Sequence, residues 1–138
     1  MKIIYDKTQC TGCQACQMAC LDQRDVSPEA VPLCRLVLGE TGQGLNYQFI
    51  HCVHCGACMK VCPSGCLYRD DRGLIQANTD QCIGCQACAA ACPLGVISFH
   101  PETGKILKCD GCVGRVEAGL LPACVHTCPT GALTLNRN

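Results

Sequence analysis

The sequence predicts an α+β fold of short β-hairpins and short helices, built around cysteine rather than around an ordinary apolar core. Of its 138 residues, 18 are cysteine, whereas two are phenylalanine, three are tyrosine and none is tryptophan. Four runs of cysteine recur along the chain, and short apolar segments flanking turn residues separate them. A chain with so many thiols and so few aromatic residues is expected to couple its folding to metal binding.

The two central runs share the spacing C-x2-C-x2-C-x3-C-P, as CVHCGACMKVCP (52–63) and CIGCQACAAACP (82–93). This spacing is typical of [4Fe–4S] runs in which the fourth cysteine binds the other cluster of a pair. The first run has the same cysteine spacing, with Leu21 in place of the closing proline, and the fourth run is irregular. Four runs of four cysteines supply enough ligands for four [4Fe–4S] clusters.

Crossed ligation requires the runs to act in pairs, and two arrangements are open: adjacent pairing (first with second, third with fourth) and nested pairing (second with third, first with fourth). We favour nested pairing because one hairpin separates the central runs and because the strand-like ends, 3–5 and 133–135, would pair and bring the outer runs together. Nested pairing predicts four ligand sets, which are Cys52, Cys55, Cys58 and Cys92; Cys82, Cys85, Cys88 and Cys62; Cys10, Cys13, Cys16 and Cys128; and Cys109, Cys112, Cys124 and Cys20.

Each run is expected to be a loop that enters a short helix, because its last two cysteines are four residues apart and therefore share a helical face. Turn residues predict three hairpins, formed by 36–38 with 47–50, 66–68 with 74–76, and 96–99 with 105–107. Residues 21–33 are expected to form a polar loop.

Two ferredoxin-like units are predicted to be fused in the chain. The inner unit covers 51–93 and contains the second and third runs. The outer unit is made from 1–50 and 94–138 and contains the first and fourth runs, with the hairpin 34–50 as an insertion.

Charge and hydropathy argue against several classes of partner. The formal net charge is zero, but sixteen thiolates on four cluster cores of about 2+ each would give a holoprotein charge of about −8. Nucleic-acid binding and membrane association are therefore not expected, and a partner with a basic docking surface is favoured. The N-terminal residues show no secretory or twin-arginine signal and no apolar run has the length of a membrane span, so we expect a cytoplasmic protein.

Zinc is the alternative occupant of the cysteine runs. CxxC pairs can hold zinc, but a triple C-x2-C-x2-C run suits three corners of a cubane better than one tetrahedron. Cys34 and Cys66 lie outside the runs and are expected to be small buried side chains, with a redox or ligand role as the less favoured alternative.

Several polar residues adjoin the predicted ligands. His51, His54 and His126 are expected to donate hydrogen bonds or pack locally rather than replace a cysteine as ligand. Lys60 and Lys108 are expected to be solvated charges, with a role in tuning the cluster potentials as the less favoured alternative. No dinucleotide, phosphate-loop or catalytic-triad motif is present, so no catalytic residue is expected in this chain.

Four segments together carry a resemblance to a known family: CTGCQACQMAC (10–20), HCVHCGACMKVCPSG (51–65), DQCIGCQACAAACPLGVISF (80–99) and, most specifically, KCDGCVGRVEAGLLPACVHTCPTGAL (108–133). They resemble the four-cluster iron–sulfur subunits of the dimethyl sulfoxide reductase type, whose relatives serve formate dehydrogenases, formate hydrogenlyase and tungsten aldehyde oxidoreductases. The resemblance implies two pseudo-symmetric ferredoxin-like units, nested ligation, and electron transfer between a molybdenum or tungsten subunit and another redox module.

The chain departs from the family pattern in two places. Gly56-Ala57 gives a tight spacing where many relatives have two extra residues, and the sequence stops at Asn138 without the C-terminal anchor of many membrane-attached relatives. The second departure favours a soluble assembly over a quinone-linked membrane partner.

Three classes of function are compatible with these observations. The favoured one is a non-catalytic electron-transfer subunit that relays single electrons between a catalytic subunit, a molybdenum or tungsten pterin enzyme or alternatively a hydrogenase, and a second redox module such as a flavin subunit. Self-stacking into a longer wire is a weaker extension of it. The second class is a free polyferredoxin that serves several oxidoreductases of anaerobic metabolism, and the third is a zinc-stapled interaction module. A bound subunit should expose apolar patches, and a free carrier a mostly acidic surface.

Overall fold

The computed structural model describes residues 1–24, 31–42 and 44–137. Its helices are short, and the longest spans eight residues. The elements follow one another as β1 (Lys2–Tyr5), α1 (Ala15–Asp22), β2 (Arg35–Thr41), β3 (Gly44–Ile50), α2 (Ala57–Val61), β4 (Leu67–Arg69), β5 (Ile75–Ala77), the 3-10 helix η1 (Thr79–Gln81), α3 (Ala87–Ala91), β6 (Ser98–Phe99), β7 (Ile106–Leu107), α4 (Val113–Glu117), α5 (Ala123–Thr127) and β8 (Leu133–Asn136).

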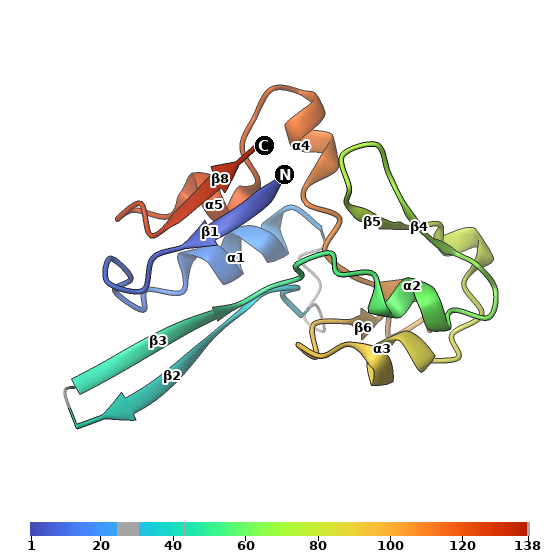
Figure 1. Ribbon diagram of the computed structural model, residues 1–138, viewed down its shortest axis with the longest axis horizontal. Helices are drawn as coiled ribbons and strands as arrows, with labels where there is room; N and C mark the ends of the chain where they lie inside the picture. Colours follow the sequence, from blue (N-terminus) through green and yellow to red (C-terminus); the bar gives the residue numbers. More distant parts are fainter. Residues whose placement is uncertain (25–30, 43, 138) are drawn as a thin grey trace.

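The strands pair two by two into antiparallel sheets, β1 with β8, β2 with β3, β4 with β5, and β6 with β7. The pairing of the chain ends is confirmed, because Ile3 lies opposite Leu135 and Tyr5 opposite Leu133. The three predicted hairpins are also confirmed. Only β2–β3 is longer than predicted, and it projects from the rest of the molecule (Figure 1).

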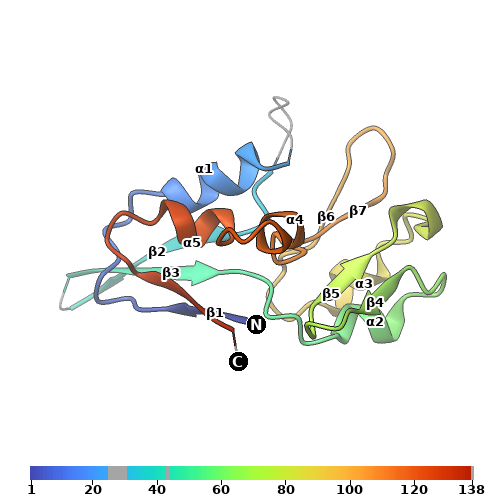
Figure 2. The ribbon, with the colours of Figure 1, turned by 90° about the horizontal axis from the view of Figure 1, so that it is seen from above.

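Helices from different cysteine runs lie against each other. Helix α1 packs on α5, and α2 packs on α3. In both views, α1, α5, β1 and β8 gather at one end of the molecule, and α2, α3, β4 and β5 at the other (Figures 1 and 2). The first and fourth runs therefore meet at one end, and the second and third runs at the other.

Each end has its own cluster of buried side chains. One cluster contains Cys58, Cys66, Leu67, Ile75, Cys88 and Ile106. The other contains Cys16, Cys34, Phe49, Val125 and Leu133. Cysteines thus take core positions that larger apolar residues occupy in most proteins, as the shortage of aromatic residues indicates.

The structure differs from the sequence predictions in the segment 21–33 and in the place of the β6–β7 hairpin. Leu21 and Asp22 belong to α1 and Leu33 is buried, so these parts of 21–33 do not form a polar loop, while residues 25–30 lie outside the described residues. Phe99 and Ile106 pack into the core cluster around Ile75. The hairpin β6–β7 therefore lies with the second and third runs, whereas the predicted domain division, which remains a prediction, places it in the outer unit.

No helix in the described part of the chain has the length and apolar character to cross a membrane.

Candidate iron–sulfur sites

Three recesses in the structure are each lined by four run cysteines. The first, of about 350 Å³, is lined by Cys52, Cys55, Cys58 and Cys92 together with apolar residues such as Ile75. Cys52 and Cys55 lie in the loop that enters α2, Cys58 lies in the first turn of α2, and Cys92 lies at the C-terminal end of α3. Two different runs therefore contribute to one recess.

In the second recess, of about 270 Å³, the third run supplies three cysteines and the second run supplies one. Cys82 and Cys85 come from the loop that enters α3, and Cys88 comes from its first turn. Cys62 comes from the C-terminal end of α2. The packing of α2 against α3 brings the end of each helix to the loop of the other.

The same arrangement recurs between α1 and α5. A recess of about 350 Å³ is lined by Cys10, Cys13, Cys16 and Cys128, with Tyr5, Phe49 and Leu133 in its wall. For the remaining four run cysteines, burial raises the pKa of Cys124, and the charges of Cys109, Cys112 and Cys20 raise it further. The structure thus places the cysteines of three predicted sets around three recesses. The fourth set and the ligation of all four remain predictions.

The local backbone explains how a loop turns around each recess. The residue before α1, α2, α3 and α4 adopts a left-handed conformation, at Gln14, Gly56, Gln86 and Cys112. Backbone N–H groups also point at sulfur in three of the runs, two from the runs themselves and one from β7. The amides of His54, Ile106 and Gly111 donate to the Sγ atoms of Cys52, Cys82 and Cys109, each over 3.4 Å. Such donors stabilise negative charge on a thiolate.

Burial raises the pKa of some cysteine thiols, and hydrogen bonds lower the pKa of others. Burial raises the pKa of Cys109 and of Cys124 to about 12, so both are protonated before metal binds. A hydrogen bond from the Cys34 thiol lowers the pKa of Cys20 to about 6 and that of Cys16 to about 7. Because iron is bound by thiolates, metal loading must release protons from the buried set.

A tetrahedral zinc site would require sulfur atoms about 4 Å apart, given Zn–S bonds of about 2.3 Å. Among the described residues, no three His, Cys, Asp or Glu side chains converge closely enough to hold a single metal ion. The cysteines instead line recesses that can contain a group of several atoms.

Comparison with known proteins identifies the kind of group these recesses hold. Residues 44–138 match the family model described as a 4Fe-4S dicluster domain. The chain belongs to this family. Residues 7–23 also match a model described as a 4Fe-4S binding domain, which covers the first cysteine run.

Curated proteins resemble this dicluster protein over nearly its whole length. The thiosulfate reductase electron transfer subunit PhsB of Salmonella typhi is 41% identical, over 98% of this chain and 74% of its own length. The probable anaerobic dimethyl sulfoxide reductase chain YnfG of Escherichia coli K12 is 41% identical, over 93% of this chain and 69% of its own. Protein NrfC of the same strain is 42% identical, over 96% of this chain and 63% of its own.

The residues of these recesses fit [4Fe–4S] clusters. The cysteines are the sulfur donors, mostly apolar side chains line the three recesses, and backbone N–H groups donate to three of the run sulfurs. These are the features by which proteins hold such clusters and set their potentials. The dicluster protein therefore binds multiple [4Fe–4S] clusters.

The residues beside the ligands only partly match expectation. Cys34 and Cys66 are buried, as predicted, and Cys66 Sγ lies 3.4 Å from Cys62 Sγ. His51 stacks on Phe49, while His54 accepts a hydrogen bond from the Ile75 amide through Nδ1 instead of donating one.

Lys60 is exposed, as predicted, but the same prediction for Lys108 is wrong, because Lys108 is buried. Its position beside Cys109 was visible in the sequence. Its burial depends on β5, which lies more than thirty residues earlier in the chain, so no local pattern indicates it.

Proposed function

We propose that this chain is the electron-transfer subunit of an oxidoreductase complex and relays single electrons through four [4Fe–4S] clusters. The convergence of cysteines from two different runs on each of three recesses, in a chain of 138 residues with four cysteine runs, is the observation that carries the proposal. Clusters held in so small a chain must lie close together, which suits conduction better than a purely structural role. The chain is not itself catalytic.

The proposed ligand sets are those of nested pairing, arranged in two fused ferredoxin-like units. The inner unit holds one cluster on Cys52, Cys55, Cys58 and Cys92 and another on Cys62, Cys82, Cys85 and Cys88. The outer unit holds the other two, on Cys10, Cys13, Cys16 and Cys128 and on Cys20, Cys109, Cys112 and Cys124. The packing of α2 on α3 and of α1 on α5 supports this assignment.

The protein's contribution to electron transfer is to hold and surround the clusters. When bound, each cluster supplies a one-electron couple. The cysteine thiolates bind iron, the apolar walls limit the access of water, and N–H groups that donate to sulfur stabilise the added negative charge of the reduced state.

A catalytic subunit with a molybdenum or tungsten pterin is the favoured partner, and a hydrogenase is the alternative. The names of the relatives, which include subunits of thiosulfate and dimethyl sulfoxide reductases, support a reductase complex. Exposed apolar side chains on the projecting β2–β3 hairpin (Val37, Leu38 and Leu45) favour a docked subunit over a freely diffusing carrier. A flavin subunit, self-stacking and a cytoplasmic location are further expectations.

The test is anaerobic purification of the tagged chain from its native lysate, followed by analysis of metals and of co-purifying polypeptides. A docked subunit should bring molybdenum or tungsten with a catalytic polypeptide, and about sixteen iron atoms per chain. The same iron content with no partner would replace the proposal with a free carrier. Zinc in a colourless protein would overturn the cluster assignment.

A further inference from the structure

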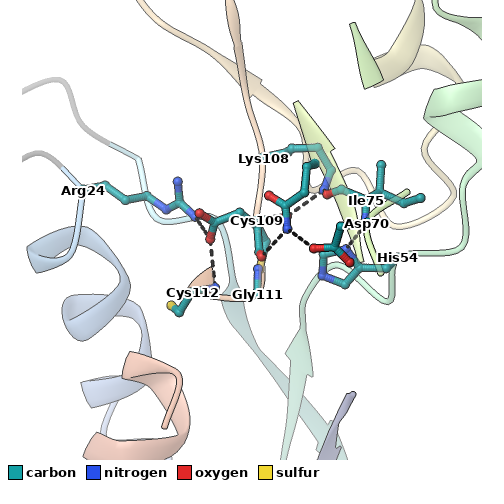
Figure 3. A network of polar contacts seen from close by, with 10 residues as sticks. Arg24, His54, Asp70, Ile75, Lys108, Cys109, Gly111 and Cys112 are labelled. Atoms are coloured by element: carbon teal, nitrogen blue, oxygen red, sulfur yellow. Dashed lines mark hydrogen bonds and ion pairs between the residues drawn. The ribbon is translucent and has the colours of Figure 1, made fainter. Parts of the chain in front are cut away.

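Lys108 is the one buried side chain with a formal charge among the described residues, with 5% of its surface exposed. It lies just after β7, where the chain passes from one end of the molecule to the other. Its Nζ donates to two backbone carbonyls, those of Ile75 in β5 and of Cys109, each over 2.6 Å (Figure 3).

This position lies between two of the proposed cluster sites. Lys108 lines the recess of Cys52, Cys55, Cys58 and Cys92. It also precedes Cys109 in the chain and hydrogen-bonds to the carbonyl of that residue, which belongs to the set with Cys20, Cys112 and Cys124. Lys108 thus touches one proposed site of the inner unit and one residue of a proposed site of the outer unit.

No carboxylate neutralises Lys108 within the described part of the chain, where each ion pair involves an arginine. Asp110 and Asp70 are engaged elsewhere: Asp110 pairs with Arg24 over 3.1 Å, and Asp70 accepts from Gln76 over 3.0 Å. Two carbonyls alone are poor compensation for a buried ammonium group. A bound cluster with four thiolates carries the negative charge that is otherwise missing.

We propose that the Lys108 ammonium is the shared counter-charge of the two clusters on either side of it, and that it raises the reduction potential of both. Reduction adds one negative charge to a cluster, and a nearby buried cation stabilises that charge strongly because solvent does not screen it. The inference rests on the proposed function, since it concerns the proposed ligand sets. It makes Lys108 a residue that sets potentials at the crossing between the two pairs.

The experiment is a potentiometric titration of the purified holoprotein, followed by electron paramagnetic resonance, with iron and sulfide analysis of each sample. Lys108→Met removes the charge, Lys108→Gln removes it but keeps a hydrogen-bond donor, and Lys108→Arg keeps it. Lys60→Met is the matched control, because Lys60 also adjoins a ligand run but is exposed. Cys55→Ser and Cys112→Ser, one in each flanking set, assign the signals.

The expected result is a lower midpoint potential for two of the four clusters in both neutral variants. The ratio of reduced to oxidised cluster at a fixed potential should fall at least tenfold, which is about 59 mV for one electron. Lys108→Arg should restore most of the shift, and Lys60→Met should show none. If only the neutral variants fail to load iron, the requirement for charge is supported.

Unchanged midpoints in a fully loaded Lys108→Met protein would overturn the inference, as would an equal shift in all four clusters or in Lys60→Met. Failure of Lys108→Arg together with both neutral variants would also overturn it, because the side chain would then be needed for its shape. The wild type tests the proposed function separately. A wild type without four clusters refutes that function, whereas four clusters without a shift refute only the role of Lys108.

Discussion

Gly84, in the third cysteine run, occupies a backbone position that a β-carbon would crowd. Its φ of +71° lies in the left-handed region, and a β-carbon there would meet the carbonyl oxygen of Gly104 at 2.9 Å. Backbone rather than a flexible side chain opposes the added atom, so the loop or the β6–β7 turn must move. The glycine therefore keeps the entry to α3 close to the hairpin that covers it.

Gly84→Ala is expected to lower the free energy of unfolding of the holoprotein by about 1–3 kcal/mol, because it combines left-handed strain with this close approach. Gly114→Ala is the matched control, since Gly114 lies in α4 with no positive φ and nothing within 4 Å of the added atom. There alanine should stabilise by about 0.5–1 kcal/mol. Thermal denaturation followed by circular dichroism measures both, and equal effects would contradict the prediction.

Cys66, which lies outside the cysteine runs, contacts the proposed ligand Cys62. Its Sγ is 3.4 Å from that of Cys62, and both line the recess of Cys82, Cys85 and Cys88. Burial works to raise the pKa of Cys62, but hydrogen bonds from Ser64 and Cys66 outweigh it and lower the pKa to about 6. Cys66 thus acts as a packing residue and a donor to a ligand sulfur.

Cys66→Ala should therefore retain all iron and lose only about 1 kcal/mol of stability for the buried atom removed. Cys85→Ala, which removes a proposed ligand of the same recess, should lose the iron of one cluster, about four atoms per chain. Iron and sulfide analysis distinguishes the two variants. Loss of a cluster in Cys66→Ala would show that Cys66 is a ligand.

At the scale of elements, the β2–β3 hairpin is attached to both ends of the molecule. Tyr5 in β1 donates through its hydroxyl to the Tyr47 carbonyl, in the middle of β3, over 2.7 Å. Arg35, the first residue of β2, donates through its two terminal nitrogens to the carbonyls of Leu94 and Gly95, each over 2.9 Å. The hairpin is therefore held both at its base and part-way along β3.

Arg35→Met should loosen the anchor to residues 94 and 95, at a cost of about 0.5–1.5 kcal/mol per hydrogen bond at most, since the side chain is exposed. Arg35→Lys should be intermediate, because a single ammonium does not reproduce the two-pronged geometry. Hydrogen exchange of the segment 94–100, measured by mass spectrometry, should be slowest in the wild type, faster in Arg35→Lys and fastest in Arg35→Met. Equal protection in all three proteins would show that the contacts do not anchor the segment.

In the molecule as a whole, the proposed iron–sulfur sites and the buried core overlap. Each of the two groups of buried side chains includes proposed ligands, Cys58 and Cys88 in one and Cys16 in the other. Polar bridges join the two ends: Asp110 pairs with Arg24 after α1, and its carbonyl accepts from Gln76 in β5 over 3.0 Å (Figure 3). These bridges are partly exposed and contribute little alone, so metal ligation must supply most of the stability.

Removal of iron by an anaerobic chelator is therefore expected to abolish cooperative unfolding. The far-ultraviolet circular dichroism of the apoprotein should lose its thermal transition, and limited proteolysis should cut the chain within the cysteine runs. Reconstitution with iron and sulfide should restore the transition. An apoprotein that still melted cooperatively would contradict the coupling of folding to metal.

The sequence alone was enough to predict the local pieces of the fold. The spacing of each run predicts a loop and a short helix because helical geometry repeats over a few residues. The apolar ends predict the pairing of β1 with β8, which brings the first and fourth runs together. The assignment of the cysteines to ligand sets stays a prediction.

Only the tertiary structure decided that Lys108 is buried and where the β6–β7 hairpin packs. Lys108 is enclosed because a carbonyl from β5, more than thirty residues earlier in the chain, meets its ammonium group. The hairpin β6–β7 packs with the inner runs because Phe99 and Ile106 find their apolar neighbours there. Burial depends on contacts between residues far apart in the chain, and short-range patterns do not encode these contacts.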